Sequence, residues 1–423
     1  MDKIRQKGLL VLRSIEKYTK TDMVYLAQGG FWTIFAQIII SLSTLGLAIA
    51  FAHYASKETY GQYKYILSIA SILGTLTLTG LGPAVIRSVN RGFDGTMNYA
   101  FWQNIKWSVL FFLTTLSLSV YYFLHGNTSL GVSMLLVGAF SPFWSSTNLY
   151  NSFLAGKKDF RRSALYFGIM GNLFPVLCLF TAIILGSSPT LLITVYFISN
   201  TLIGVILYIK VLKIYKPNDS VDNEALAYSK HLSFMGILGA VADNIDQILI
   251  FHYIGAVELA IYNFAIAIPS QIKGPIKGFA GLIFPKFVER SDEEIKKGIK
   301  NKYIFLFLVS ICIIISYVIF APYIFHIFFP KYTDSIFYSR IFSISLLWII
   351  AIPADAYWVA KKKIREQYIT NISSSIIQIA VLFVGILWWG LLGLVLAQIM
   401  SKILRSLISM ALFERSSKKI MTV

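Results

Sequence analysis

Long apolar runs recur along the whole chain, and short polar stretches separate them. Each run holds about 20 mostly apolar residues, the length that a helix needs to cross the hydrocarbon core of a membrane. Because backbone groups in hydrocarbon must pair within their own segment, we expect each run to be a helix. We place twelve spans, at residues 30–52, 65–87, 101–124, 130–154, 163–186, 190–212, 232–253, 258–285, 303–320, 335–360, 368–388 and 391–413.

The composition agrees with a membrane protein and excludes several other classes. Of the 423 residues, 56% are hydrophobic and 14% are charged, whereas soluble domains carry roughly 25% charged residues. The mean hydropathy is +0.67. These values exclude a soluble globular protein, a disordered chain and a nucleic-acid-binding domain. Cys178 and Cys312 each lie inside an apolar run, so they form no disulfide framework.

The basic residues concentrate on one side of the predicted topology. The net charge is +18, and most lysines and arginines lie in the N-terminal segment, in every second connection and in the tail. Because positively charged loops stay cytoplasmic, both termini are predicted to be cytoplasmic. The charge is therefore a topology signal, strengthened by anionic lipid, in a multi-pass membrane protein.

A weak internal repeat divides the twelve spans into two sets of six. His53-Tyr54 ends span 1 and His252-Tyr253 ends span 7, and Tyr63 and Tyr262 follow at the same spacing. Six is an even number, so both copies begin in the cytoplasm and are parallel, related by a pseudo-two-fold axis along the membrane normal. The predicted fold class is an all-α polytopic membrane protein with two six-helix lobes.

The predicted domains follow from the spans and the repeat. Residues 1–28 have the pattern of an amphipathic surface helix, and the first span is too long for the apolar region of a cleaved signal peptide. The domains are a cytoplasmic N-terminal segment (1–28), an N-lobe (29–212), a cytoplasmic linker (213–231), a C-lobe (232–413) and a cytoplasmic tail (414–423).

The loops offer no place for a catalytic domain. No P-loop or HExxH motif occurs, so neither nucleotide hydrolysis nor a zinc site is indicated, and no cofactor is expected. The outward loops are very short, whereas a membrane polymerase or glycosyltransferase usually carries a sizeable one. We therefore expect a transporter or channel with its site among the helices, not an enzyme.

Charged residues inside the spans are costly and indicate functional sites. Lys273 and Lys277 share one face of span 8, which also holds Pro269, Pro275 and Pro285 and should be kinked. One interpretation is a cationic cavity that binds phosphate or pyrophosphate. The alternative is structural ion pairing with span 7, where Asp243 and Asp246 lie. Those two carboxylates are candidates either for ion coupling or for pairing to the lysines.

Other polar residues in the predicted spans have structural or functional interpretations. Arg87 ends span 2 and either faces the cavity or anchors the interface. Arg340, near the outer start of span 10, either lines an outward vestibule or pairs with Asp334. Lys402 and Arg405 are interpreted as interfacial anchors. The span asparagines face either sugars or neighbouring helices; they are Asn148, Asn151 and Asn172.

Several short motifs resemble one known family. The outward turn S-K-E-T-Y-G-Q-Y at 56–63 resembles that family's P-E-E-[YF]-G-x-Y, and G-L-G-P-A-V-I-R at 80–87 resembles its G-L-G-x-A-[VI]-x-R. D-N-I-D-Q-I-L-I at 243–250 is similar to its D-x-[IL]-x-[IL]-G, without the final glycine. The family is that of the O-antigen and polysaccharide repeat-unit flippases, within the multidrug/oligosaccharidyl-lipid/polysaccharide exporter superfamily.

This resemblance implies a MATE-like fold and a flippase function. The implied substrate is undecaprenyl-pyrophosphate-linked oligosaccharide, moved from the cytoplasmic to the periplasmic leaflet during polysaccharide or lipopolysaccharide biosynthesis. Arg87, Lys273, Lys277 and Arg340 would bind it while the lobes alternate access, and Asp243 or Asp246 would couple transport to an ion. Implied partners are membrane lipids, a polysaccharide polymerase and a chain-length regulator, but no nucleic acid.

Two other functions stay open. A multidrug cation antiporter of the same superfamily should have an acidic or aromatic cavity, which two central lysines argue against. A membrane glycosyl polymerase or ligase is disfavoured by the short outward loops.

Overall fold

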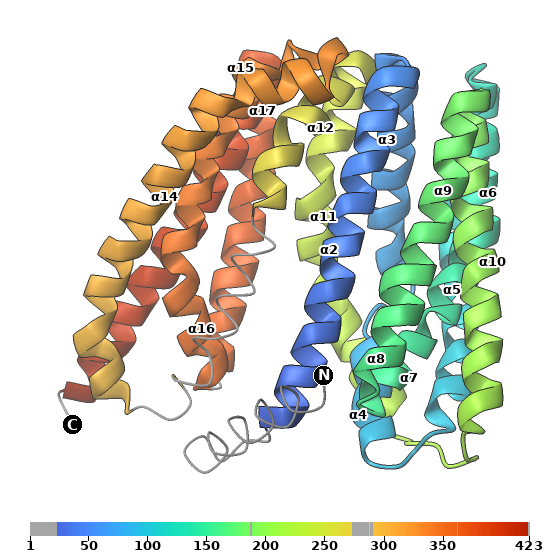
Figure 1. Ribbon diagram of the computed structural model, residues 1–423, viewed down its shortest axis with the longest axis horizontal. Coiled ribbons are helices and arrows are strands. Elements are labelled where there is room, and N and C mark those ends of the chain that lie inside the picture. The colour runs from blue at the N-terminus through green and yellow to red at the C-terminus, as the bar shows by residue number, and fades with distance from the viewer. Residues whose placement is uncertain (1–22, 187, 273–286, 288–290, 362, 422–423) are drawn as a thin grey trace, which may run out of the picture. The chain divides into compact units, whose positions relative to one another are not determined.

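In the computed structural model, helices account for all the regular structure of the described residues (Figure 1). These residues are 23–186, 188–272, 287, 291–361 and 363–421. The first half contains α2 (Met23–Tyr54), α3 (Lys57–Leu73), α4 (Leu81–Asn90), α5 (Thr96–Leu124), α6 (Thr128–Thr147), α7 (Leu149–Gly156), α8 (Phe160–Ser163), α9 (Gly171–Leu185) and α10 (Pro189–Tyr215). The second contains α11 (Ala225–Tyr253), α12 (Ala256–Gln271), α14 (Asp292–Phe328), α15 (Ser335–Ser343), α16 (Ile352–Ala360) and α17 (Ile364–Met421).

The all-helical polytopic fold agrees with the sequence prediction. Nine stretches of described helix are long and apolar enough to cross a membrane, or ten if the bent pair α3 and α4 is one span. One of the nine, α17, holds both predicted spans 368–388 and 391–413, and α12 is the described part of span 258–285. The exact count of twelve stays a prediction, because residues 273–286 lie outside the described part.

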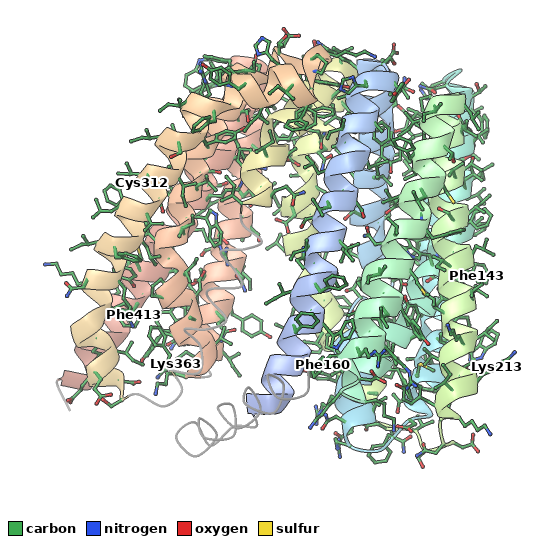
Figure 2. The ribbon with its side chains drawn as sticks, viewed as in Figure 1. Phe143, Phe160, Lys213, Cys312, Lys363 and Phe413 are labelled. Atoms are coloured by element: carbon green, nitrogen blue, oxygen red, sulfur yellow. The ribbon has the colours of Figure 1, made fainter. Side chains whose placement is uncertain are left out.

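The apolar side chains explain why these helices suit a membrane. Phe305 and Leu308 on α14 are 64% and 56% exposed, and such exposure is favourable only where lipid replaces water. Figure 2 shows Phe143 of α6 and Cys312 of α14 at the outer surfaces of the helices that carry them. The outward-facing sides of these helices therefore present hydrocarbon to lipid.

Helix ends follow local sequence signals. Ser188 caps α10 by accepting a hydrogen bond from the backbone N–H of Leu191 at 3.2 Å, and Pro189 occupies the first turn, where no N–H is needed. Ser291 caps α14 in the same way, and its first turn carries Asp292, Glu293 and Glu294. These carboxylates stabilise the N-terminus of α14 because they lie at the positive end of the helix dipole.

Several spans are broken rather than straight. The helices α3 and α4 meet at 55° around residues 77–80. Between α15 and α16, residues Ile344–Ala351 form a 3-10 helix that ends just before Pro353. Proline removes a helical hydrogen bond and crowds the carbonyl four residues earlier, which accounts for this break. In α17, Gly390 has φ 56° and separates the two predicted spans.

The helices form two compact units. Unit 1 contains the residues up to Ala50 and Leu73–Phe234, and unit 2 contains Phe51–Ile72 and Met235–Val423. Residues 51–72, which precede the bend in span 2, thus pack within unit 2. The predicted lobe boundaries at 29–212 and 232–413 stay a prediction. The lobes were predicted from an internal repeat, whereas the two units are defined by contacts between residues, so the two divisions need not coincide.

Within unit 1, polar contacts hold the connection between α10 and α11. The carboxylate of Asp222 accepts a hydrogen bond from the Ser88 hydroxyl at 2.8 Å, and its backbone N–H donates to the Thr96 hydroxyl at 3.0 Å. Lys157 pairs with Asp94 at 2.7 Å. The connection is therefore fixed to the ends of α4 and α5.

Within unit 2, a close backbone contact holds α3 against α12. A Cβ atom added at Gly61 would lie 1.8 Å from the carbonyl oxygen of Ala256. Nearby, the rings of Tyr60 and Phe264 lie 4.9 Å apart, and Lys57 pairs with Asp334 at 2.6 Å. These contacts explain why α3 belongs to unit 2.

The substitution Gly61→Ala is expected to destabilise the protein by about 1–3 kcal/mol, because the backbone of α12 must move to admit a methyl group. The measurement is the Tm of the purified protein in detergent. Gly46→Ala is the matched control, since a Cβ at Gly46 meets nothing within 4 Å. An unchanged Tm for Gly61→Ala would contradict this packing.

Candidate substrate cavity

Unit 2 contains a polar cavity of about 650 Å³, an unusual feature inside an apolar helix bundle. Its walls come from α11, α12, the 3-10 segment with its flanking helices, and α17. Apolar residues such as Ile266, Phe342 and Trp348 share the lining with polar ones. The polar lining includes Asp243, Asp246, Ser270, Asp355, Asn371, Ser374, Ser375, Gln378, Gln398, Lys402, Arg405 and Ser406.

Asp246 is the most buried carboxylate of the cavity, at 3% exposure. Its Oδ2 accepts hydrogen bonds from the Tyr262 hydroxyl at 2.5 Å and from Gln398 Nε2 at 2.9 Å. Its Oδ1 accepts one from the backbone N–H of Gln247 at 2.8 Å. A buried carboxylate is tolerated only when such donors replace water, so this network fixes α11, α12 and α17 around one acidic group.

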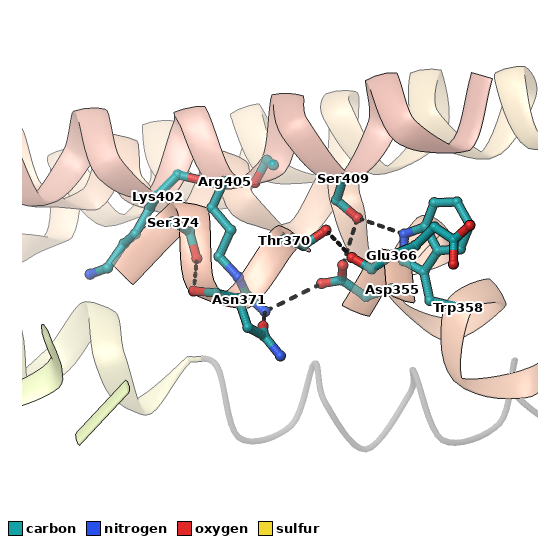
Figure 3. A network of polar contacts seen from close by, with 10 residues as sticks. Asp355, Trp358, Glu366, Thr370, Asn371, Ser374, Lys402, Arg405 and Ser409 are labelled. Carbon is teal, nitrogen blue, oxygen red and sulfur yellow. Dashed lines mark hydrogen bonds and ion pairs between the residues drawn. The ribbon is translucent and has the colours of Figure 1, made fainter. Parts of the chain in front are cut away.

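A second polar network lies around Arg405 on α17 (Figure 3). Arg405 Nη2 lies 3.5 Å from Asn371 Oδ1 and 4.0 Å from Asp355 Oδ2. Asp355 also accepts a hydrogen bond from the Ser409 hydroxyl at 2.7 Å, and that hydroxyl accepts one from Trp358 Nε1 at 3.2 Å. This network positions a guanidinium and a carboxylate on the cavity wall.

The described lining carries both signs of charge. Asp243, Asp246 and Asp355 are acidic, whereas Lys402 and Arg405 are basic. Asp243 is exposed and Asp246 is buried. The predicted cationic character therefore depends on Lys273 and Lys277, which lie outside the described residues. Ser270, near the described end of α12, lines the cavity, and Lys273 follows it closely in the sequence.

The structure corrects the interpretation of Lys402 and Arg405. The sequence indicated interfacial anchors, but both side chains line the cavity. The signal that would have found them is a polar face of span 12, on which Gln398 and Lys402 are spaced i, i+4 and Arg405 follows three residues later. Both predicted ion-coupling carboxylates, Asp243 and Asp246, line the same cavity.

The two predicted arginines lie elsewhere. Arg87 belongs to unit 1, where it lies 3.8 Å from Glu224 and 5.2 Å above the ring of Tyr228. Arg340, on α15, is exposed and its Nε donates to the Val318 carbonyl at 3.0 Å. Arg340 is not among the residues that line the described cavity. Asp334, its alternative partner, pairs with Lys57.

Two of the predicted asparagines also have defined surroundings. Asn151 accepts a hydrogen bond from the Ser163 hydroxyl at 2.7 Å, which connects α7 to α8 and favours the helix-packing interpretation. The side-chain oxygen of Asn172 is buried without a hydrogen-bond partner. Across the described residues, His, Cys, Asp and Glu side chains form no group of three suited to a metal ion.

The helical fold is similar to that of solved MATE family transporters. Similar solved structures include a multidrug resistance MATE family transporter of the MOP superfamily in its inward-facing conformation, with TM-score 0.71, 14% identity, and coverage of 91% of this chain and 96% of that one. The outward-facing conformation of such a transporter gives TM-score 0.62, 15% identity, and coverage of 91% and 94%.

A MOP superfamily transporter from Pyrococcus furiosus is also similar, with TM-score 0.58, 14% identity, and coverage of 93% and 94%. That transporter is described as having a binding pocket of reverse polarity, which suggests a different function for it. At these identities the likeness shows the fold alone. A search of curated proteins gave no match.

The assignment of the chain to a family rests on a match of its sequence. The profile of the family described as polysaccharide biosynthesis protein matches residues 26–291. This match covers more than half of the chain, so the chain belongs to the polysaccharide biosynthesis protein family. Its long apolar helices make it a multi-pass membrane protein.

Proposed function

We propose that the protein flips undecaprenyl-pyrophosphate-linked oligosaccharide repeat units from the cytoplasmic to the periplasmic leaflet of the bacterial inner membrane, with both termini cytoplasmic. Transport would proceed by alternating access, with the headgroup held in the polar cavity of unit 2. Family membership supports a role in polysaccharide biosynthesis. The single observation that carries the proposal is the polar cavity within lipid-facing helices, because a hydrophilic headgroup needs such a path across hydrocarbon.

The chemistry of the lining suits the two parts of the substrate. Ammonium and guanidinium groups form strong charge-assisted hydrogen bonds with phosphate oxygens, and Lys402 and Arg405 supply one of each. Amides and hydroxyls, such as Asn371, Gln378 and Ser374, match the hydroxyls of sugars. Lys273 and Lys277 are proposed to bind the substrate beside this lining, Arg87 and Arg340 to bind it outside the described cavity, and Asp243 and Asp246 to couple transport to an ion. A polymerase and a chain-length regulator would receive the product.

A deletion strain tests this function directly. Without the protein, surface polysaccharide should disappear and single lipid-linked repeat units should accumulate in the cytoplasmic leaflet. Complementation with the intact chain should restore both. Accumulation of the same units in the periplasmic leaflet would instead indicate a polymerase and contradict the proposal.

The three carboxylates of the described lining favour a second candidate, the export of organic cations. Asp243, Asp246 and Asp355 would attract a cationic compound. This function predicts that the deletion strain keeps its surface polysaccharide and becomes more sensitive to cationic drugs.

A further inference from the structure

Part of the cavity lies between two points at which α11 and α17 touch. At one point the Tyr368 hydroxyl of α17 donates to Met235 Sδ of α11 at 2.6 Å. At the other, Gln378 Nε2 of α17 donates to the backbone carbonyl of Ala242 on α11 at 2.7 Å. Residues of both helices between these two contacts line the cavity. We call the cavity space between the two helices there the α11–α17 slot.

One wall of the slot contains two glycines. Gly236 and Gly239 of α11 line the cavity, and a Cβ atom added at either would meet no atom of the described residues within 4 Å. Glycine weakens a helix interior, and here, unlike at Gly61, no close helix contact requires it. Because a bare backbone lets a ligand approach closely, this wall has room for a flat ring lying against α11.

The opposite wall carries hydroxyl and amide groups at helical spacing. Asn371, Ser375 and Gln378 are spaced i, i+4 and i+7 on α17, and all three line the cavity. Gln378 donates to Ala242 through its amide nitrogen, which leaves its amide oxygen as an acceptor. The Ser375 hydroxyl donates and accepts, and the amide nitrogen of Asn371 donates. This wall therefore offers uncharged donors and acceptors, the set that sugar hydroxyls need.

The charges of the described lining differ between the two ends of the slot. Arg405 Nη2 lies 3.5 Å from Asn371 Oδ1, so a guanidinium marks the Asn371 end (Figure 3). Asp243, which also lines the cavity, follows Ala242 directly and marks the Gln378 end. A phosphate is favoured beside the guanidinium and repelled by the carboxylate. The slot therefore suits an uncharged group whose phosphate lies at the Asn371 end.

We propose that the α11–α17 slot binds the sugar that is bonded directly to the pyrophosphate of the substrate, and that this sugar is an uncharged pyranose. The inference rests on the proposed function and names the part of that substrate which the cavity selects. With the pyrophosphate at Arg405, the attached ring begins at Asn371 and extends toward Gln378. Its C–H face lies against the glycine wall, and its hydroxyls bond to α17. A sugar carboxylate would meet Asp243 and be rejected.

The experiment measures binding of soluble glycosyl methyl pyrophosphates to the purified full-length protein in nanodiscs of neutral lipid, by calorimetry. The sugars are glucose, galactose, N-acetylglucosamine, N-acetylgalactosamine and glucuronic acid, and dimethyl pyrophosphate is the reference without a sugar. At least one neutral probe should bind about tenfold or more tighter than the reference, the gain expected from two or three hydrogen bonds. The glucuronosyl probe should bind more weakly than that neutral probe.

Three variants locate the gain in the slot. Gly239→Leu fills the slot and should abolish the gain from the sugar, with the affinity for dimethyl pyrophosphate unchanged. Ser375→Ala removes one hydroxyl and should weaken binding of the preferred probe about two- to tenfold. Gly298→Leu is the matched control and should bind every probe as the wild type does. Gly298 lies on α14 outside the described lining, and a Cβ there also meets no described atom within 4 Å.

The proposal is overturned if the folded wild type binds no neutral probe more tightly than dimethyl pyrophosphate, if the glucuronosyl probe binds tightest, or if Gly239→Leu keeps the preference. Should Gly239→Leu not fold, Ser375→Ala decides, and an unchanged affinity for the preferred probe overturns the proposal. Binding requires no transport. A deletion strain that keeps its surface polysaccharide would thus refute the proposed function and leave a measured sugar preference intact.

Discussion

Replacement of both Lys273 and Lys277 by alanine is expected to lower polysaccharide export at least about a hundredfold, which corresponds to roughly 3 kcal/mol of lost binding to a charged group. The two lysines share a helix face next to Ser270 of the cavity lining. Without them the described lining has more acidic than basic groups, so a doubly charged headgroup would meet net repulsion. The measurement is complementation of the deletion strain, with protein abundance in the membrane checked in parallel.

The matched control for this experiment is the pair Lys296→Ala and Lys300→Ala. These lysines have the same i, i+4 spacing in α14, near its beginning and outside the cavity. The control should export normally. If the Lys273 and Lys277 double variant also exports at the wild-type rate, these lysines do not bind the headgroup, and the ion-pairing alternative for span 8 is favoured.

The substitution Asp246→Ala should lower the free energy of unfolding by about 3 kcal/mol, the largest stability change expected for a cavity residue. It leaves the Tyr262 hydroxyl, the Gln398 amide and the Gln247 backbone N–H without their acceptor. An unsatisfied buried donor costs about 1–3 kcal/mol. Asp246→Asn retains an acceptor oxygen and should cost clearly less. The measurement is denaturant or thermal unfolding of the purified protein.

Asp243→Ala provides the comparison on the same helix, because Asp243 is exposed. Its effect should stay within about 0.5 kcal/mol, as for most surface positions. Equal stability of the Asp246→Ala and Asp243→Ala variants would show that the Asp246 network does not hold α11, α12 and α17 together.

The helical fold was predictable because membrane insertion depends on local composition. Where the structure describes them, the predicted runs are helical apart from short breaks such as residues 77–80, since hydrocarbon admits few other structures. The packing of residues 51–72 in unit 2 was not predictable from composition. It depends on the contact of Gly61 with Ala256, which are far apart in the sequence. The 3-10 segment before Pro353 had a local signal, the proline itself.

The candidate site was predictable in part. Asp243 and Asp246 were found because carboxylates in the middle of an apolar span are rare and costly. Lys402 and Arg405 were misinterpreted because they lie toward one end of their span, where basic residues usually serve as anchors. Which lysines face a cavity depends on helix rotation, and neighbouring helices fix that rotation.

The most direct test of the central claim is translocation of a defined undecaprenyl-pyrophosphate-linked glycan in liposomes that contain only the purified protein. The glycan is placed in one leaflet, and its appearance in the other leaflet is followed with a membrane-impermeant glycosidase or lectin, with and without a proton or sodium gradient. The account predicts protein-dependent movement that a suitable gradient accelerates and that the Lys273 and Lys277 double variant lacks. Movement no faster than in protein-free liposomes under every gradient would contradict it.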